Sequence, residues 1–156
     1  MGQYHQIYNL TKKETICPHA MGAGAKLLEW GCGDGAGMYT AAIALYLANS
    51  NGRGGGALYV RQGYTKNFKP KKRTKKQQQL VDFINNISGR WAGDKIVVQG
   101  DYAEKGDKAF ISEKQLGAYV DISEDCLKAL YVDGYFREQA LNSDGYLENK
   151  YAAPIA

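Results

Sequence analysis

The sequence predicts a single α+β domain over residues 1–156, with a mixed or antiparallel sheet packed by about three helices. A chain of this length is large enough to bury one hydrophobic core. Its strand-like and helix-like segments follow one another without a regular strand–helix–strand order, which favours α+β over a doubly wound fold. Glycine makes up 19 of the 156 residues, so many tight turns are expected.

The N-terminal half begins with a predicted hairpin. Residues 3–10 and 14–17 have strand-like patterns, and the polar residues 11–13 between them suit a turn. Residues 26–30 are predicted to form a short helical turn. Residues 36–48 are rich in helix formers and apolar nearly all round, which indicates a buried helix.

The C-terminal half continues the mixture. A short strand is predicted over 57–61, and apolar residues at helical spacing predict a helix over 74–87. Strands are predicted over 94–99 and 119–122. A third helix begins at Ser123, where two acidic residues follow at the positive end of the helix.

The net charge of +4 is unevenly distributed. Residues 61–76 hold eight of the 20 basic residues and no acid, so the rest of the chain carries 12 − 16 = −4. The segment is predicted to be a solvated basic loop, with attraction of nucleic acid as the alternative. The polar tail, residues 142–156, is predicted to be peripheral.

The three cysteines show neither Cys-x-x-Cys nor Cys/His spacing, which argues against a zinc site or a disulfide framework. We expect no metal and no cofactor, and reduced thiols in a cytoplasmic location. No apolar run approaches the ~18 residues of a membrane span, so no membrane partner is expected. Whether the chain forms an oligomer is left open.

The stretch from Ser88 to Tyr102 is the most informative part of the sequence. Its apolar centre, Ile96–Val98, is flanked by Gly93-Asp94 and Gly100-Asp101. A strand with polar and aromatic residues at both ends is typical of a binding site. The alternative is structural, with Arg90 forming an ion pair with Asp94 or Asp101.

The whole chain resembles a group of small bacterial, phage and fungal proteins that begin MGQYH or MGQYW. The matching pieces are Met1–His5, Asn9–Lys13, Pro18-His19, Lys26–Glu29, Arg53–Gly56, Gly89–Asp94, Gly100–Ala103 and Asp121–Ser123. The group brings no established activity. The resemblance implies a location, because the matched residues are mostly polar or glycine and suit a shared pocket.

Leu27–Gly37 also resembles motif I of class I S-adenosylmethionine-dependent methyltransferases, with Glu29, Gly31, Gly33 and Gly35 matching. The acid that the family carries about twenty residues later is missing. This resemblance implies a methyltransferase as one alternative function.

We therefore predict a binding protein for a nucleotide-like or phosphorylated small molecule. In a phage, such a protein would act in counter-defence as a sponge, that is, it would sequester a nucleotide signal of the host's immune system. Arg53 would hold an anion and the aromatic rings would stack a base. The alternatives are a hydrolase or phosphodiesterase with His5 and His19 as candidate catalytic residues, and an interaction module acting through 61–76. The predicted ligand-binding residues are Tyr4, His5, Glu29, Arg53, Arg90, Trp91, Asp94, Asp101 and Tyr102. Arg90, Trp91, Asp101 and Tyr102 are expected near Arg53 and His5.

Overall fold

The computed structural model describes residues 2–31, 36–49 and 65–132. A four-stranded mixed sheet forms its centre, in the order β3-β1-β2-β4. The strands are β1 (His5–Asn9), β2 (Glu14–Ile16), β3 (Ile96–Gly100) and β4 (Val120–Asp121). β1 pairs antiparallel with both β2 and β3, and β2 pairs parallel with β4. The predicted α+β fold class is confirmed.

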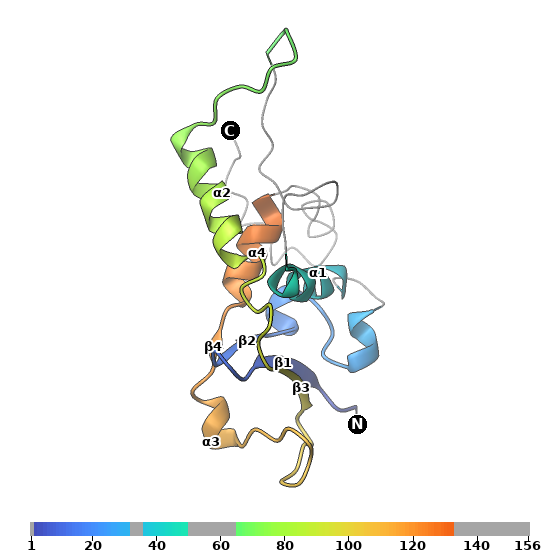
Figure 1. The fold of residues 1–156 in the computed structure, drawn as a ribbon. Coiled ribbons are helices and arrows are strands. Elements are labelled where there is room, and N and C mark those ends of the chain that lie inside the picture. Colours follow the sequence, from blue (N-terminus) through green and yellow to red (C-terminus); the bar gives the residue numbers. More distant parts are fainter. Residues whose placement is uncertain (1, 32–35, 50–64, 133–156) are drawn as a thin grey trace.

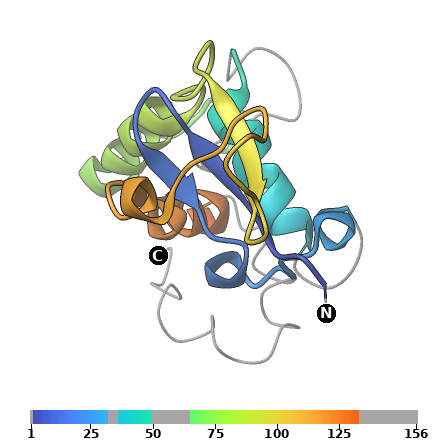
Figure 2. The same cartoon turned by 90° about the horizontal axis from the view of Figure 1, so that it is seen from below.

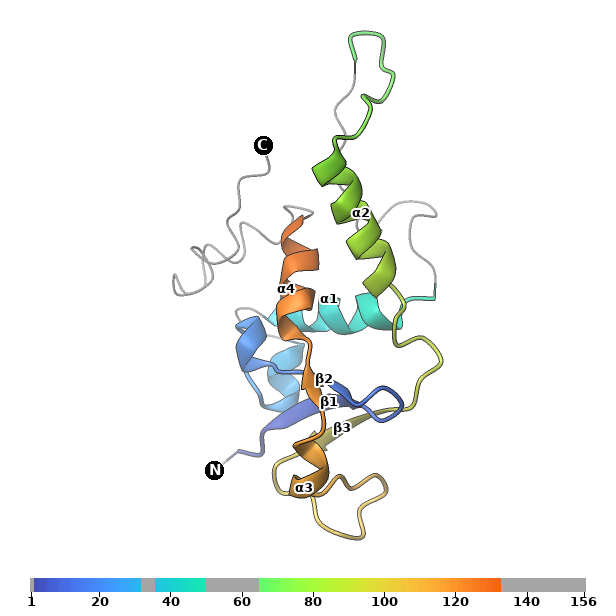
Figure 3. The same ribbon diagram turned by 90° about the vertical axis from the view of Figure 1, so that its left-hand side faces the viewer.

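Helices lie on both sides of this sheet. The α-helices are α1 (Ala36–Leu47), α2 (Lys75–Ile87), α3 (Glu113–Leu116) and α4 (Ser123–Val132). Two short 3-10 helices, η1 (His19–Met21) and η2 (Leu27–Trp30), follow β2. Figure 1 and Figure 3 show α1, α2 and α4 on one side of the sheet and α3 on the other.

The N-terminal hairpin forms as the alternating pattern predicts, and its register places Ile7 opposite Ile16. Both side chains are buried and face α1 and α4. Figure 2 shows β1 between β2 and β3, with α1, α2 and α4 behind the sheet. The predicted helices over 36–48 and 74–87 and the helix starting at Ser123 are also present, within a residue at most of their boundaries.

Tyr39 connects α1 to the sheet through its hydroxyl. The hydroxyl donates to the carbonyl of Ile16 (2.8 Å) and accepts from the N–H of Ile7 (3.3 Å). Because the ring is fully buried, desolvation raises the pKa of Tyr39 well above its usual range. The neutral Tyr39 hydroxyl both donates and accepts a hydrogen bond, and in this way it joins α1 to β1 and β2.

Two elements were not predicted from the sequence, namely α3 and η1. Ser112 caps α3 through a reciprocal contact with Gln115, so this single helical turn depends on a capping box. The predicted strand over 57–61, Arg53 and the tail over 142–156 lie outside the described residues. No helix in the described part of the chain is long and apolar enough to cross a membrane.

Candidate functional site

The residues predicted to form one pocket lie at two different ends of the sheet. In the register of β1 and β3, His5 pairs with Gly100 and Asn9 pairs with Ile96. Tyr4, Asp101 and Tyr102 therefore lie beside one end of β1, while Arg90, Trp91 and Asp94 lie beside the other. Four residue steps along a strand span roughly 13 Å. The predicted convergence of Arg90 and Trp91 with Asp101 and Tyr102 is wrong.

Arg90 and Trp91 bind the buried carboxylate of Glu14. The guanidinium of Arg90 contacts both carboxylate oxygens, and the indole Nε1 of Trp91 donates to Oε2 at 2.8 Å. Burial alone would raise the pKa of Glu14, but the hydrogen bonds from Arg90 and Trp91 outweigh it and leave that pKa lowered. The ring of Trp91 is fully buried against Tyr46. Both residues consequently hold the hairpin against the helices.

Asp94 holds the turn between β1 and β2. Its carboxylate accepts a hydrogen bond from Asn9 Nδ2 (2.7 Å) and pairs with the ammonium of Lys12. Both hydrogen bonds lower the pKa of Asp94, and the one from Lys12 has the larger effect. The other amide atom of Asn9, Oδ1, accepts from the backbone N–H groups of Thr11 and Lys12. The ion pair that the sequence suggested for Arg90 thus forms with Glu14, and Asp94 pairs with Lys12.

At the opposite end of β1, the predicted residues form a more exposed group. The N–H of Tyr4 donates to the carboxylate of Asp101 (3.0 Å), and the Tyr4 ring contacts His19 edge-on. The rings of Tyr4 and Tyr102 are exposed. His5 Nδ1 is buried and has no hydrogen-bond partner in the described structure. Both candidate histidines are therefore near Tyr4. His5 is the next residue in the chain, and the ring of His19 contacts the ring of Tyr4.

Glu29 has a local structural role. Its carboxylate accepts the N–H of Lys26 (3.1 Å) and lies 3.8 Å from the Lys26 ammonium. The segment Leu27–Trp30 that contains it is a 3-10 helix. The strand that a methyltransferase motif I needs before Glu29 is therefore replaced by helix, while Gly33 and Gly35 lie outside the described residues.

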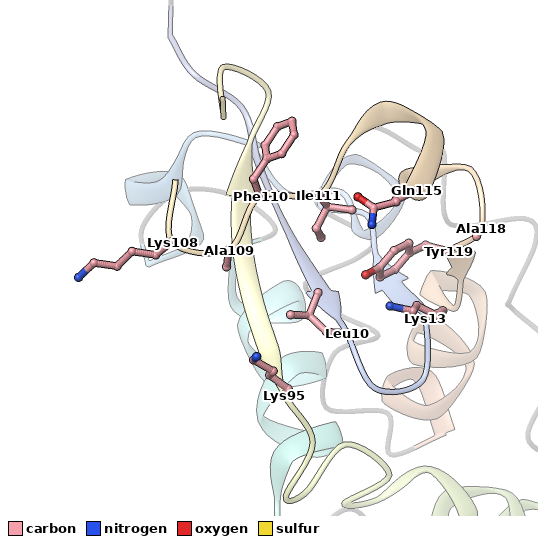
Figure 4. A pocket seen from close by; sticks show the side chains of 10 residues that line it. All are labelled: Leu10, Lys13, Lys95, Lys108, Ala109, Phe110, Ile111, Gln115, Ala118 and Tyr119. Atoms are coloured by element: carbon pink, nitrogen blue, oxygen red, sulfur yellow. The ribbon is translucent and has the colours of Figure 1, made fainter. Parts of the chain in front are cut away.

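A pocket of about 340 Å³ opens on the sheet face that carries α3. Its charged and polar lining consists of Lys13, Lys95, Lys108, Gln115 and Tyr119. Its apolar lining consists of Leu10, Ala109, Phe110, Ile111 and Ala118. Figure 4 shows Lys13, Gln115 and Tyr119 gathered on one side of this pocket, with Lys108 extending outward on the other.

The hairpin turn positions two of the pocket lysines. Lys13 ends the turn with φ of +57°, and its N–H donates to the Asn9 carbonyl (3.0 Å). Lys95 lies beside the same turn, since its carbonyl accepts from Leu10 N–H (2.8 Å) and its N–H donates to Thr11 Oγ1 (3.0 Å). The Asn9–Asp94 contact therefore supports the part of the backbone from which both lysines extend.

The far wall of the pocket is attached to β3 and to the turn. Both amide atoms of Gln99 bond to the backbone of Ile111, at 2.7 and 2.9 Å. The N–H of Val120 donates to the carbonyl of Lys13 (2.8 Å), and the ring of Tyr119 contacts Tyr8 edge-on. These bonds fix the spacing between the hairpin turn and the segment that precedes β4.

The charged side chains that line the pocket are all positive. No carboxylate lines it, and in the described part of the chain none of its three lysines forms an ion pair. Lys13 lies 5.4 Å from the centre of the Tyr119 ring. The Oε1 atom of Gln115 accepts from both the N–H and the hydroxyl of Ser112, so its Nε2 donor stays available. Such a set of donors fits an anion.

The pocket residues were missed by sequence reasoning. Lys13 was recognised only as part of a turn, and Lys95, Lys108 and Tyr119 are separated from it by more than 80 residues. The local signals were weak: Lys13 adjoins the strand predicted over 14–17, and Lys95 lies inside the strand predicted over 94–99. Their meeting depends on the pairing of β1 with β3, which no local pattern specifies.

Comparisons with protein-family models, curated proteins and solved structures give no match for this chain. Among the described residues, no group of three or more His, Cys, Asp or Glu side chains is placed to hold a metal ion. The case for a function therefore depends on the pocket and on the surface of this chain.

Proposed function

We propose that the protein binds a small anionic molecule, of the nucleotide-like or phosphorylated class, in the pocket between the hairpin turn and α3. The observation that carries this proposal is that Lys13, Lys95 and Lys108 all line a cavity that no carboxylate lines. Like charges held together without counter-charges in the protein repel one another, and a bound anion relieves that repulsion.

The size and remaining lining of the pocket support the same class of ligand. A volume of about 340 Å³ falls in the lower part of the range of roughly 300–1,000 Å³ for small-molecule sites. The apolar side chains and the rings of Phe110 and Tyr119 offer surface for a base or another flat group. The phosphate would contact the lysines and the Nε2 of Gln115.

The test is a thermal-shift and calorimetric screen with cyclic nucleotides, ADP-ribose derivatives and inorganic phosphate. We expect at least one phosphorylated compound to stabilise the protein. The double variant Lys13→Gln/Lys95→Gln should bind it about tenfold more weakly or worse, since each lost charge-assisted hydrogen bond contributes about 1.5–3 kcal/mol. The matched control, Lys105→Gln/Lys114→Gln, removes the same charge from exposed residues outside the pocket lining.

Two results would overturn this site. One is the absence of any shift at ligand concentrations of several millimolar. The other is a ligand whose affinity is unchanged in the pocket variant but is lost in Tyr4→Ala or Tyr102→Ala, which would locate binding at the opposite end of the sheet.

The fate of the bound ligand separates binding from catalysis. We propose binding without turnover, which is what a protein that sequesters a nucleotide signal requires. Mass spectrometry of the ligand after prolonged incubation should therefore recover it unchanged. A hydrolysed product that disappears in His5→Ala or His19→Ala would instead support the hydrolase alternative.

A further inference from the structure

The basic arm, which we define as residues 65–76, stands apart from the body of the protein. Figure 1 and Figure 3 show it extending beyond the N-terminal end of α2, on the opposite side of the molecule from α3. All twelve of its residues are exposed. The arm continues into α2, which packs against the body through the buried Ile84 and Ile87. On the same helix, the ring centre of Phe83 lies 4.3 Å from the ammonium of Lys128.

The arm carries charge of one sign only. It contains seven basic residues and no acid, namely Lys66, Lys69, Lys71, Lys72, Arg73, Lys75 and Lys76. Among the described residues, no salt bridge involves Lys66, Lys69, Lys72, Arg73, Lys75 or Lys76. The positive N-terminal end of α2, capped by Thr74, adds to the same field.

Phe68 lies in the turn that begins the arm. Its side chain is 89% exposed, and its backbone has φ of +56°, a left-handed conformation that is unfavourable for an aromatic residue. Hydrogen bonds close the turn around it, from Phe68 N–H to the Thr65 carbonyl (3.0 Å) and from Thr65 N–H to the Lys69 carbonyl (2.8 Å). An exposed ring held in a strained backbone conformation points to a contact outside the chain.

We infer that the basic arm binds single-stranded nucleic acid, with its lysines and Arg73 on the phosphates and Phe68 stacked on an unpaired base. Lys and Arg neutralise phosphates without regard to sequence, and every base offers a flat face to an aromatic ring. This surface is separate from the pocket proposed above, and neither proposal depends on the other.

A single strand fits the arm better than a duplex or a membrane surface. In a duplex the bases are already stacked on one another, so the exposed ring of Phe68 would have no flat face to contact. A membrane surface would need several apolar side chains to enter it, whereas Phe68 is the one large apolar side chain in the arm.

The test measures binding of the full-length protein to a fluorescent 20-nucleotide oligo-dT by anisotropy over a series of NaCl concentrations. We expect binding that weakens steeply with salt, with a slope of log K against log[salt] of up to about −5 if all seven charges engage phosphates at about 0.7 each. Lys72→Gln/Arg73→Gln should reduce the magnitude of this slope by about 1.4. The charge-matched control Lys105→Gln/Lys114→Gln should leave the slope unchanged.

The aromatic part of the inference has its own variant. Phe68→Ala should weaken oligo-dT binding about fivefold or more, Phe68→Trp should retain it, and a 20-base-pair duplex should show no such dependence. The inference is overturned if oligo-dT does not bind at 50 mM NaCl, or if the arm and control variants lose equal affinity. It is also overturned if vesicles of anionic lipid bind in a Phe68-dependent manner while oligo-dT does not.

Discussion

Asn9 Nδ2 donates a hydrogen bond of 2.7 Å to Asp94 Oδ2, and this contact joins the first hairpin to the loop before β3. Asn9 is fully buried, and its Oδ1 accepts from Thr11 and Lys12 in the turn. A single amide therefore shapes the hairpin turn and fixes it to a segment 85 residues away in the sequence. The proposed pocket depends on this contact, because Lys13 and Lys95 extend from the backbone on its two sides.

Replacing Asp94 with alanine should lower the free energy of unfolding, since the buried Asn9 amide loses its acceptor. Urea denaturation measures this change. Asp82→Ala removes an exposed aspartate that accepts a hydrogen bond from Gln78 on the same helix, and it should change the free energy by less than about 0.5 kcal/mol. If the two variants are equally stable, the role of Asp94 in holding the turn is refuted.

The Asp94→Ala variant should also weaken ligand binding in the pocket. A loosened turn no longer fixes the spacing between Lys13 and Lys95, although neither lysine is changed. Calorimetry with a ligand from the screen measures this effect, and Asp82→Ala again serves as the control. An unchanged affinity would show that the pocket does not depend on the Asn9–Asp94 contact.

The Glu14–Arg90 pair should be energetically coupled, whereas the Lys26–Glu29 pair should not. The side chain of Glu14 is 9% exposed and accepts three hydrogen bonds from one guanidinium. The ammonium of Lys26 lies 3.8 Å from the carboxylate of Glu29, and both of these side chains are exposed. Double-mutant cycles with alanine should give a coupling above about 1 kcal/mol for the first pair and below about 0.5 kcal/mol for the second. Equal coupling in the two cycles would contradict this expectation.

Glu14 should make stability dependent on pH on the acid side. Its pKa in the folded protein lies below the value of 4.5 expected for the unfolded chain. The stabilisation is thus complete above about pH 4.5 and is lost as the pH falls through the lower pKa of the folded state. We expect the difference in unfolding free energy between the wild type and Glu14→Gln to shrink between pH 5 and pH 3. A difference that is constant over that range would argue against this linkage.

Gly89 and Gly93 should differ sharply in their tolerance of alanine. Both have positive φ, at +71° and +81°, so both substitutions cost backbone strain. A Cβ on Gly89 would also lie 2.3 Å from the Ala48 carbonyl oxygen, whereas a Cβ on Gly93 would meet nothing within 4 Å. Gly89→Ala should therefore unfold at a lower urea concentration than Gly93→Ala. Equal midpoints would show that the loop moves away from α1 at little cost.

The reason for this difference is that Gly89 closes the end of α1. Its N–H donates to the Leu45 carbonyl (2.9 Å), and the N–H of Trp91 donates to the Tyr46 carbonyl (2.8 Å). The segment from Gly89 to Asp94, which the sequence marked as part of a binding site, thus satisfies a helix end, a buried carboxylate and a hairpin turn. These structural roles explain why the segment is rich in polar residues and glycine.

Local periodicity and capping predict the fold class and most of the secondary structure, with α3 and η1 as the exceptions. The alternation of residues 3–10 and 14–17 gave the hairpin, the apolar run over 36–48 gave α1, and Thr74 with the apolar stripe behind it gave α2. The sequence also identified the basic segment, since charge density is readable without a structure. It predicted Arg90, Trp91 and Asp94 to bind a ligand, whereas in the structure they contact Glu14 and Asn9 of the same chain.

The grouping of these residues in space depends on the tertiary structure. The antiparallel pairing of β1 with β3 separates Asp94 from Asp101 by the length of a strand, although the two are seven residues apart in sequence. The same pairing brings Lys95 to Lys13 and gives Arg90 the partner Glu14, which no local pattern indicated. Side chains distant in sequence meet through strand register and buried hydrogen bonds, and these depend on the whole chain folding together.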